Sequence, residues 1–68
     1  MASILEKREE VKRIAREKGI EGAKGLALQY PLVWLKAYQR YPNAKKIQVT
    51  QTLLGVPYAV VDEKWVIE

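Results

Sequence analysis

The sequence predicts an α+β domain in which helices come first and a small antiparallel sheet follows. Three observations support this order: a capped amphipathic stretch near the N-terminus, a second helical stretch bounded by prolines, and alternating, β-branched residues after Lys46. The chain has 68 residues, the length of one domain with one hydrophobic core. We therefore expect residues 1–68 to form a single small domain.

The first helix is predicted from Ile4 to Lys18. Ser3 and Glu6 have the spacing of a capping box, which satisfies backbone N–H groups of the first turn. Gly19 follows the last periodic residue and suits the left-handed position at the end of a helix. Charged residues at i,i+4 spacing indicate ion pairs on a solvated face. Two such pairs are Glu9 with Arg13 and Arg13 with Glu17.

The next stretch resembles a helix-turn-helix. Four residues recur at helical spacing: Ala23, Leu26, Ala27 and Tyr30. Pro31 suits the first position of a further helix, which we expect to run to about Tyr41. On the helix-turn-helix template, Lys36 and Arg40 lie one turn apart on the face that meets the DNA groove. Gln29 departs from the motif, because glycine is common at that place in the turn.

The sequence pattern of the last third of the chain predicts strands. Residues 47–53 alternate between apolar and polar types, as in a half-buried strand, and Gly55 follows. An alternative for the same residues is a short helix capped by Thr50 and ended by Gly55. Residues 58–61 and 64–67 flank a tight turn at Asp62 and Glu63. The element order resembles winged-helix domains, but their wings are usually basic, so the acidic turn indicates a structural or dimeric hairpin.

Charge and aromatic residues point to nucleic acid. The formal net charge is +4, and no Asp or Glu occurs between Gly22 and Val61. Positive charge releases counterions from a polyanion, and flat side chains pack on sugars or bases. We expect a DNA-binding protein, with DNA favoured over RNA, in a transcription-regulator, recombination-accessory or chromatin role. The expected phosphate contacts are Lys24, Lys36, Arg40, Lys45 and Lys46. A plainer explanation is that the second half of the chain is the more buried half.

An aromatic stripe follows Pro31. Trp34, Tyr38 and Tyr41, preceded by Tyr30, recur at helical spacing. We expect these rings to pack in the core rather than to form a base-stacking platform, because a short chain without Phe builds its interior from the aromatic residues it has.

Three glycines, Gly19, Gly22 and Gly25, come at intervals of three residues, although glycine costs a helix interior about 1 kcal/mol relative to alanine. Residues 20–26, Ile-Glu-Gly-Ala-Lys-Gly-Leu, resemble the I-x-G-x-x-G loop of KH domains, and residues 44–49 are similar to the strand after the second helix of that family. The resemblance implies an RNA- or single-stranded-DNA-binding module in which this loop clamps the nucleotide backbone.

Several functions are disfavoured by composition. The chain has no Cys and no His, which removes disulfides, the usual zinc ligands and the commonest general base. We therefore expect no enzyme, no metal and no cofactor. No run approaches the roughly 20 apolar residues of a membrane span, and no signal-peptide core follows Met1, so we expect a cytoplasmic chain without a membrane partner. The Lys-, Arg- and Glu-rich first helix and the absence of Cys also fit a thermophilic source.

A second class of function is a non-enzymatic interaction module. A sheet of two or three strands leaves unpaired edges, which favour pairing with another chain. Tyr58 and Trp65 are candidates to cap such a homodimer. Measuring binding at several salt concentrations distinguishes the nucleic-acid-binding function from the interaction module, because polyanion binding weakens steeply with ionic strength and apolar association does not.

Overall fold

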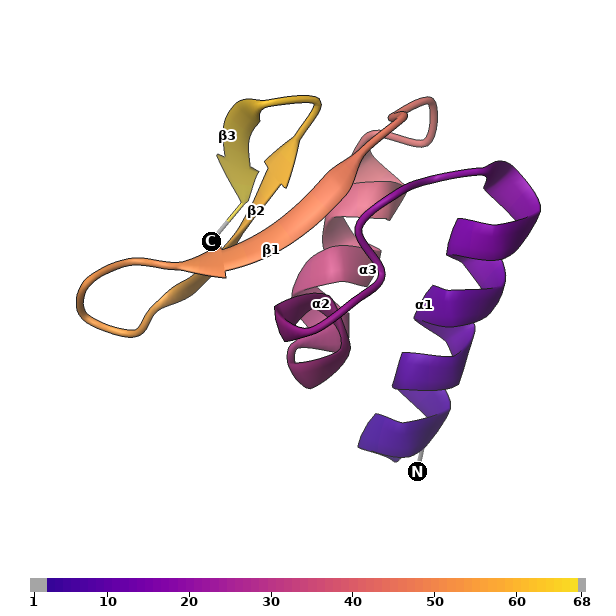
Figure 1. The fold of residues 1–68 in the computed structure, drawn as a ribbon, viewed down its shortest axis with the longest axis horizontal. Coiled ribbons are helices and arrows are strands. Elements are labelled where there is room, and N and C mark those ends of the chain that lie inside the picture. Colours follow the sequence, from indigo (N-terminus) through magenta and orange to yellow (C-terminus); the bar gives the residue numbers. More distant parts are fainter. Residues whose placement is uncertain (1–2, 68) are drawn as a thin grey trace.

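Three helices precede three strands in the part of the chain that the structure describes (Figure 1). The computed structural model describes the backbone of residues 3–67 and the side chains of residues 3–64. The elements are α1 (Ile4–Lys18), α2 (Leu26–Gln29), α3 (Pro31–Arg40), β1 (Ile47–Gln51), β2 (Pro57–Val61) and β3 (Lys64–Ile67). The strands form one antiparallel sheet in the order β1-β2-β3. The predicted α+β order is confirmed, and it is compatible with the winged-helix resemblance.

Helix α1 begins and ends at the predicted residues. The Ser3 hydroxyl accepts a hydrogen bond from the Glu6 N–H at 3.1 Å. Gly19 adopts a left-handed conformation with φ 68°, and the Ile20 N–H donates to the Ala15 carbonyl at 2.9 Å. Ile20 is buried, so the residue after the helix ties its end to the core.

The ion pairs of α1 differ from the predicted ones. Lys7 pairs with Glu10 and Lys12 with Glu9, each at 3.6 Å and at i,i+3 spacing. Glu9 thus pairs with Lys12 rather than with Arg13. Exposed pairs of this kind contribute about 0.3 to 0.5 kcal/mol each, so the difference has little effect on stability.

Helix α2 starts later than the helical spacing from Ala23 indicates, and that prediction is wrong. Glu21 instead forms a parallel bridge with Lys46 beside β1. The Glu21 N–H donates to the Lys45 carbonyl at 3.2 Å, and the Ile47 N–H donates to the Glu21 carbonyl at 3.0 Å. Because these backbone groups bond next to β1, residue 21 pairs as in a strand, residues 22–25 form a loop that ends in a turn, and α2 has only four residues. The supporting helix of the helix-turn-helix template is therefore much shorter than expected.

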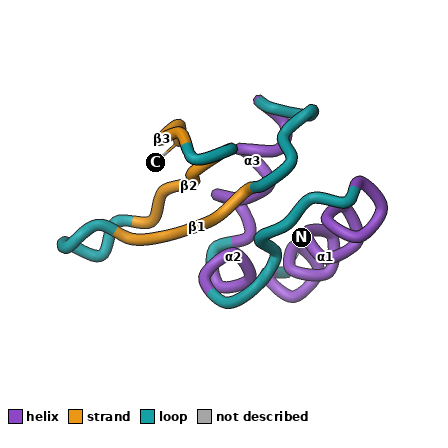
Figure 2. The backbone as a smooth tube through the Cα atoms, turned by 45° about the horizontal axis from the view of Figure 1, so that its top comes forward, coloured by secondary structure: helices purple, strands orange, loops and turns teal. Residues whose placement is uncertain are grey.

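Helix α3 is the centre of the fold. Among the described residues it contacts every other helix and strand, whereas α1 contacts α2 and α3 but no strand. Figure 2 shows the helices to one side of the sheet. Trp34 is fully buried and stacks on Tyr38 with ring centroids 6.0 Å apart, as the core interpretation of the aromatic stripe predicts. Among residues 3–64 the buried core includes Val11, Ala15, Ile20, Ala27, Trp34, Leu35, Ala37, Ala44, Ile47, Val49, Ala59 and Val61.

The sheet buries one face against α3. Ile47 is opposite Val61 and Val49 is opposite Ala59, and all four are buried, while Gln48 between them is exposed. The predicted strand is confirmed over the first five residues of the 47–53 segment, and burial alternates from Ile47 to Val49, whereas Gln51 is exposed.

The two loops of the sheet are turns. The β1–β2 connection is organised by Thr52, whose hydroxyl accepts from the N–H groups of Leu54 and Val56 at 3.3 and 3.2 Å. The alternative of a short helix from Thr50 to Gly55 is wrong. In the β2–β3 turn Asp62 and Glu63 both have positive φ, 49° and 69°, as a two-residue hairpin turn requires.

Candidate nucleic-acid interface

Gly22 brings the 21–25 segment into direct contact with β1. Its φ is +109°, and a Cβ built at this position would overlap the carbonyl oxygen of Ile47. Only glycine allows two backbone segments to approach this closely. The contact places Ala23 and Lys24 beside the beginning of β1.

Asp62 holds the other side of the same region. Its carboxylate accepts hydrogen bonds from the backbone N–H groups of Lys45 and Lys46 at 3.1 and 2.9 Å. The Asp62 N–H in turn donates to the Lys46 carbonyl at 2.9 Å. The acidic turn therefore has a structural role, as its departure from a basic wing indicates, and it fixes the backbone from which the Lys46 side chain projects.

A hollow of about 620 Å³ lies between α1, the 21–25 segment and β1. Three cationic residues line it: Arg16 from α1, Lys24 from the segment, and Lys46 next to β1. Glu21 is the one acidic residue in its lining. Three cations and one acid give a net charge of +2. Gln48, Gly22, Ala23, Ala15 and Ile20 complete the lining.

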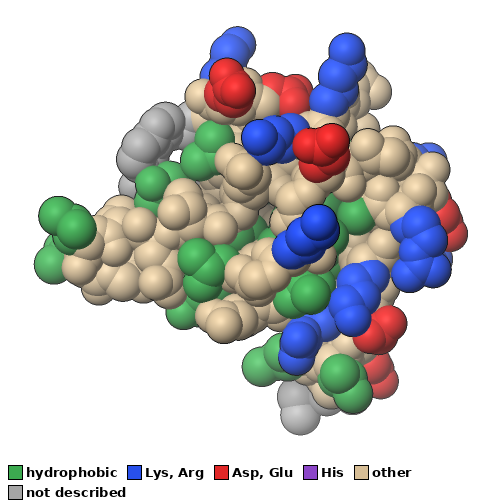
Figure 3. Space-filling view, in the orientation of Figure 1, with side chains coloured by type: hydrophobic (Ala, Val, Ile, Leu, Met, Phe, Trp, Pro, Cys, Tyr) green, Lys and Arg blue, Asp and Glu red, His purple; other side chains and the backbone are tan. Residues whose placement is uncertain are grey.

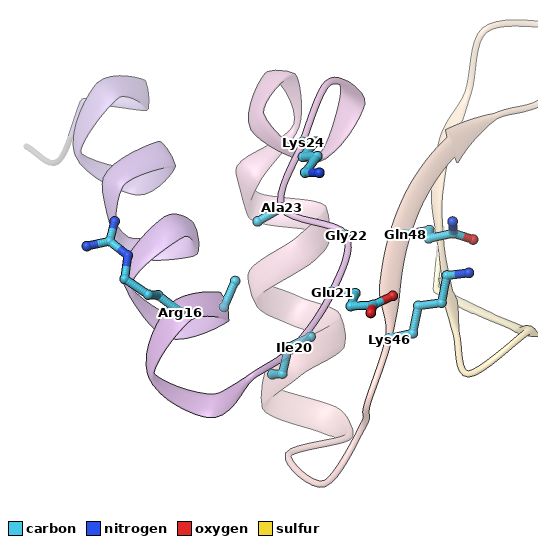
Figure 4. A pocket seen from close by; sticks show the side chains of 9 residues that line it. Arg16, Ile20, Glu21, Gly22, Ala23, Lys24, Lys46 and Gln48 are labelled. Carbon is cyan, nitrogen blue, oxygen red and sulfur yellow. The ribbon is translucent and has the colours of Figure 1, made fainter.

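The side chains around the hollow differ in direction (Figure 4). Lys24 extends from the segment, and Lys46 and Gln48 extend from the chain at the start of β1, on the side away from α1 in this view. Arg16 lines the hollow, but its side chain extends over α1 and its guanidinium points away from the segment in this view. Among the described side chains Glu21 forms no ion pair, which leaves Lys24 and Lys46 available to a ligand.

The backbone of the segment has unpaired donors at residues that line the hollow. The N–H groups of Gly22, Ala23 and Lys24 donate to no other residue in the described part of the chain. Backbone amides are strong donors that need a partner, which here is solvent or a bound anion.

The five predicted phosphate contacts do not form one surface. Lys24 and Lys46 line the hollow. Lys36 and Arg40 lie on the exposed side of α3, where the Arg40 guanidinium carbon is 5.8 Å from the centre of the Tyr41 ring. Lys45 is exposed, and its described contacts are backbone hydrogen bonds.

Arg16 is not among the five predicted phosphate contacts. The sequence allows the cations of the first helix, Arg16 included, to contact phosphates, but it favours a solvated, salt-bridged face for them. Arg16 lies in the last turn of α1, shortly before Gly19 reverses the chain direction, and this position is the one signal that placed it near the 21–25 segment. Figure 3 shows Lys and Arg side chains gathered over α1, with Asp and Glu side chains among them.

Other kinds of site find less support. The side chains of residues 3–64 contain no group of three potential metal ligands. No helix in the described residues combines the length and apolarity that a membrane span needs. Trp34 is buried and cannot stack on bases, whereas the Tyr30 hydroxyl accepts a hydrogen bond from Gln51 Nε2 at 2.8 Å. The Trp65 side chain, a predicted dimer contact, lies outside the described residues.

Compared with protein-family models, with curated proteins and with solved structures, the chain has no match.

Proposed function

We propose that this chain binds nucleic acid, with the phosphates of one strand lying in the cationic hollow. One observation carries the proposal: Arg16, Lys24 and Lys46, which come from three separate segments, border a single concave surface. If these cations were only solvated surface charges, nothing would bring residues from three segments to one concave surface. The close contact of Gly22 with Ile47 also holds two of these segments in fixed relation.

The chemistry of the hollow suits a phosphodiester. Lysine ammonium groups act as point charges for phosphate oxygens, and unpaired backbone amides add neutral donors. Binding releases condensed counterions and is therefore favoured at low salt. Gln48 supplies a neutral donor and acceptor beside the phosphates for a sugar or base. The sequence favours DNA, and phosphate contacts of this kind serve DNA and RNA alike.

The test compares two double variants with the same change in charge. Lys24→Glu with Lys46→Glu alters the hollow, and Lys36→Glu with Arg40→Glu alters α3. We expect the hollow variant to lose at least tenfold in affinity for a single-stranded oligonucleotide and the α3 variant to lose much less. All four side chains are partly or fully exposed, so both variants should keep the melting temperature of the parent chain.

Salt dependence gives a second readout. Three neutralised phosphates predict a slope of about −2 in log affinity against log salt for a single strand, or roughly a twenty-fold loss between 50 and 200 mM salt. Removing two of the cations should reduce the slope to about −0.7. Unchanged affinity and slope in the hollow variant would rule out the proposed site.

A second candidate is duplex DNA binding by α3. Its supporting observation is that Lys36, Gln39 and Arg40 share the exposed side of one helix, the arrangement in which a helix contacts a DNA groove. In that case the α3 variant loses duplex affinity and the hollow variant keeps it. The same pair of variants, titrated with duplex and single-stranded DNA, therefore decides between the two surfaces.

A further inference from the structure

The hairpin of β1 and β2 ends in an exposed apolar tip. Leu53 is fully exposed and Leu54 is 91% exposed, and Val56 beside them is 44% exposed. Figure 3 shows hydrophobic side chains at this end of the molecule, away from the Lys and Arg side chains that gather over α1. From Ile47 to Val61 the sequence has no charged residue. Large apolar side chains exposed together indicate an interaction site.

The tip is rigid rather than a loose loop. Besides the two hydrogen bonds that the Thr52 hydroxyl accepts, the Thr52 N–H donates to the Val56 carbonyl and the Gly55 N–H donates to the Thr52 carbonyl, both at 3.0 Å. A turn held in this way fixes the backbone that carries the two leucines, so little backbone entropy is lost when a partner buries them.

The chain also has an apolar groove of about 480 Å³ at the start of α1 and α3. Its apolar lining comes from Ile4, Tyr30, Pro31, Leu32 and Val33. Ile4 is 68% exposed and Leu32 is 65% exposed, so the groove is open to solvent. Its one charged lining residue, Lys7, lies 3.6 Å from the Glu10 carboxylate, which leaves the groove close to neutral.

We propose that a second copy of this chain inserts its Leu53–Leu54 tip into this groove. Two leucine side chains have eight carbon atoms, which at about 30 Å³ each, the volume of a water molecule in the liquid, need about 240 Å³. The groove accommodates them with room for part of Val56. A neutral tip and a nearly neutral groove also meet without burying an unpaired charge.

A second copy fits the tip better than lipid or nucleic acid does. Residues 51–57 contain no Lys, Arg, Trp or Tyr, the residues that anchor a protein at a membrane interface. The same absence of cations leaves the tip without a phosphate contact. Within the described residues, an apolar groove of matching size is present on the chain itself.

The contact area indicates reciprocal exchange. At about 100 Å² for each large side chain, one tip in one groove covers roughly 400 Å² from Leu53, Leu54, Ile4 and Leu32. This area is well below the approximately 1,000 Å² of a stable interface, whereas two reciprocal contacts bury about 800 Å² before the polar rim is added. The assembly is therefore a weak dimer with two equivalent contacts.

Sedimentation equilibrium from about 10 μM to 1 mM tests this dimer. We expect dimers in the upper part of this range that persist at high salt, because apolar contacts are not screened. Leu54→Asp and Leu32→Lys should each weaken the dimer at least tenfold. Leu5→Asp is the matched control, since Leu5 is 64% exposed on α1 but does not line the groove. All three positions are exposed, so thermal melting should show folded chains.

Mixing separates the proposed contact from other self-association. Leu54→Asp and Leu32→Lys place opposite charges at the two sides of one contact, so a mixture of the two variants should form heterodimers although neither forms homodimers. Monomers at every concentration would overturn the proposal. A dimer that Leu54→Asp abolishes but Leu32→Lys leaves intact would also overturn it, because such a dimer is held by a tip-to-tip contact. Binding to lipid vesicles that depends on Leu54, in a chain that forms no dimer, would overturn it as well. The Lys24→Glu, Lys46→Glu variant should dimerise normally, which keeps this test independent of nucleic-acid binding.

Discussion

The backbone of Gly22 lies directly against the carbonyl group of Ile47, with no room for a side chain between them. This contact joins the segment after α1 to the edge of the sheet, and the hydrogen bonds between Glu21 and residues 45 and 47 hold it in register. The 21–25 segment and β1, which both line the cationic hollow, are held together by this contact. The glycine is therefore required by packing, whether or not the hollow binds a ligand.

Gly22→Ala should lower the free energy of unfolding by about 2 to 4 kcal/mol, because the new Cβ overlaps backbone atoms and the positive φ disfavours any side chain. Gly19→Ala is the control, since its φ of +68° is also positive but a Cβ there has no neighbour within 4 Å. The control should cost only about 1 to 2 kcal/mol. Denaturant unfolding of both variants measures the difference, and equal losses would contradict the close contact.

Asp62→Ala should destabilise the fold by about 1 to 2 kcal/mol. The substitution removes the acceptor of the Lys45 and Lys46 N–H groups, and the exposure of Asp62 keeps the loss near the low end for hydrogen bonds to a charged group. Asp62→Asn retains one carbonyl acceptor and should lose about half as much. Glu63→Ala, with the same charge change but no described hydrogen bond, should have almost no effect on the melting temperature. A similar loss at both positions would mean that charge, not hydrogen bonding, matters here.

Glu63→Gly should stabilise the protein by about 0.5 to 1 kcal/mol. Glu63 has a φ of 69°, a conformation that costs a residue with a side chain about 1 to 2 kcal/mol. Glycine removes this cost but also raises the entropy of the unfolded chain, which offsets part of the stabilisation. Thermal melting measures the change. A lower melting temperature would show that the Glu63 side chain makes a stabilising contact.

Trp34→Ala should cost about 3 to 5 kcal/mol, because Trp34 is the largest fully buried side chain among residues 3–64. Trp34→Phe should cost no more than about 1 to 2 kcal/mol, since it keeps an aromatic ring and removes an indole N–H that is buried without a described partner. Denaturant unfolding of the two variants compares them. Equal destabilisation would indicate that the indole N–H has a partner, such as a buried water molecule.

Ala23→Asp should weaken oligonucleotide binding at least fivefold, because it puts an acid in the lining of the hollow. Ala23 also packs against the core, so the variant should melt at a lower temperature, and binding is measured where the chain is folded. Gln39→Asp adds the same charge on the exposed side of α3 and is the matched control. Fluorescence anisotropy at a fixed salt concentration measures both affinities. If Gln39→Asp has the larger effect, α3 rather than the hollow faces the nucleic acid.

Local signals in the sequence were sufficient for most of the secondary structure. Ser3 and Gly19 mark the ends of α1 through hydrogen bonds to residues at most five positions away, and Pro31 marks the start of α3 through its own backbone geometry. The alternation that begins at Ile47 depends on the two faces of a strand. Each of these features acts within a few residues, so the sequence predicts it without knowledge of the fold.

The candidate site was decided by contacts between distant residues. Helical spacing from Ala23 predicted a helix, but the backbone of Glu21 bonds to residues 45 and 47 instead, and this gain in the folded chain outweighs local preference. The same packing separates Lys24 and Lys46 from Lys36 and Arg40, and brings Arg16 to the hollow. The sequence by itself determined α1, α3, the strands and the excess of positive charge. The tertiary structure alone decided which charges share a surface, because that depends on how the 21–25 segment packs against β1 at Gly22.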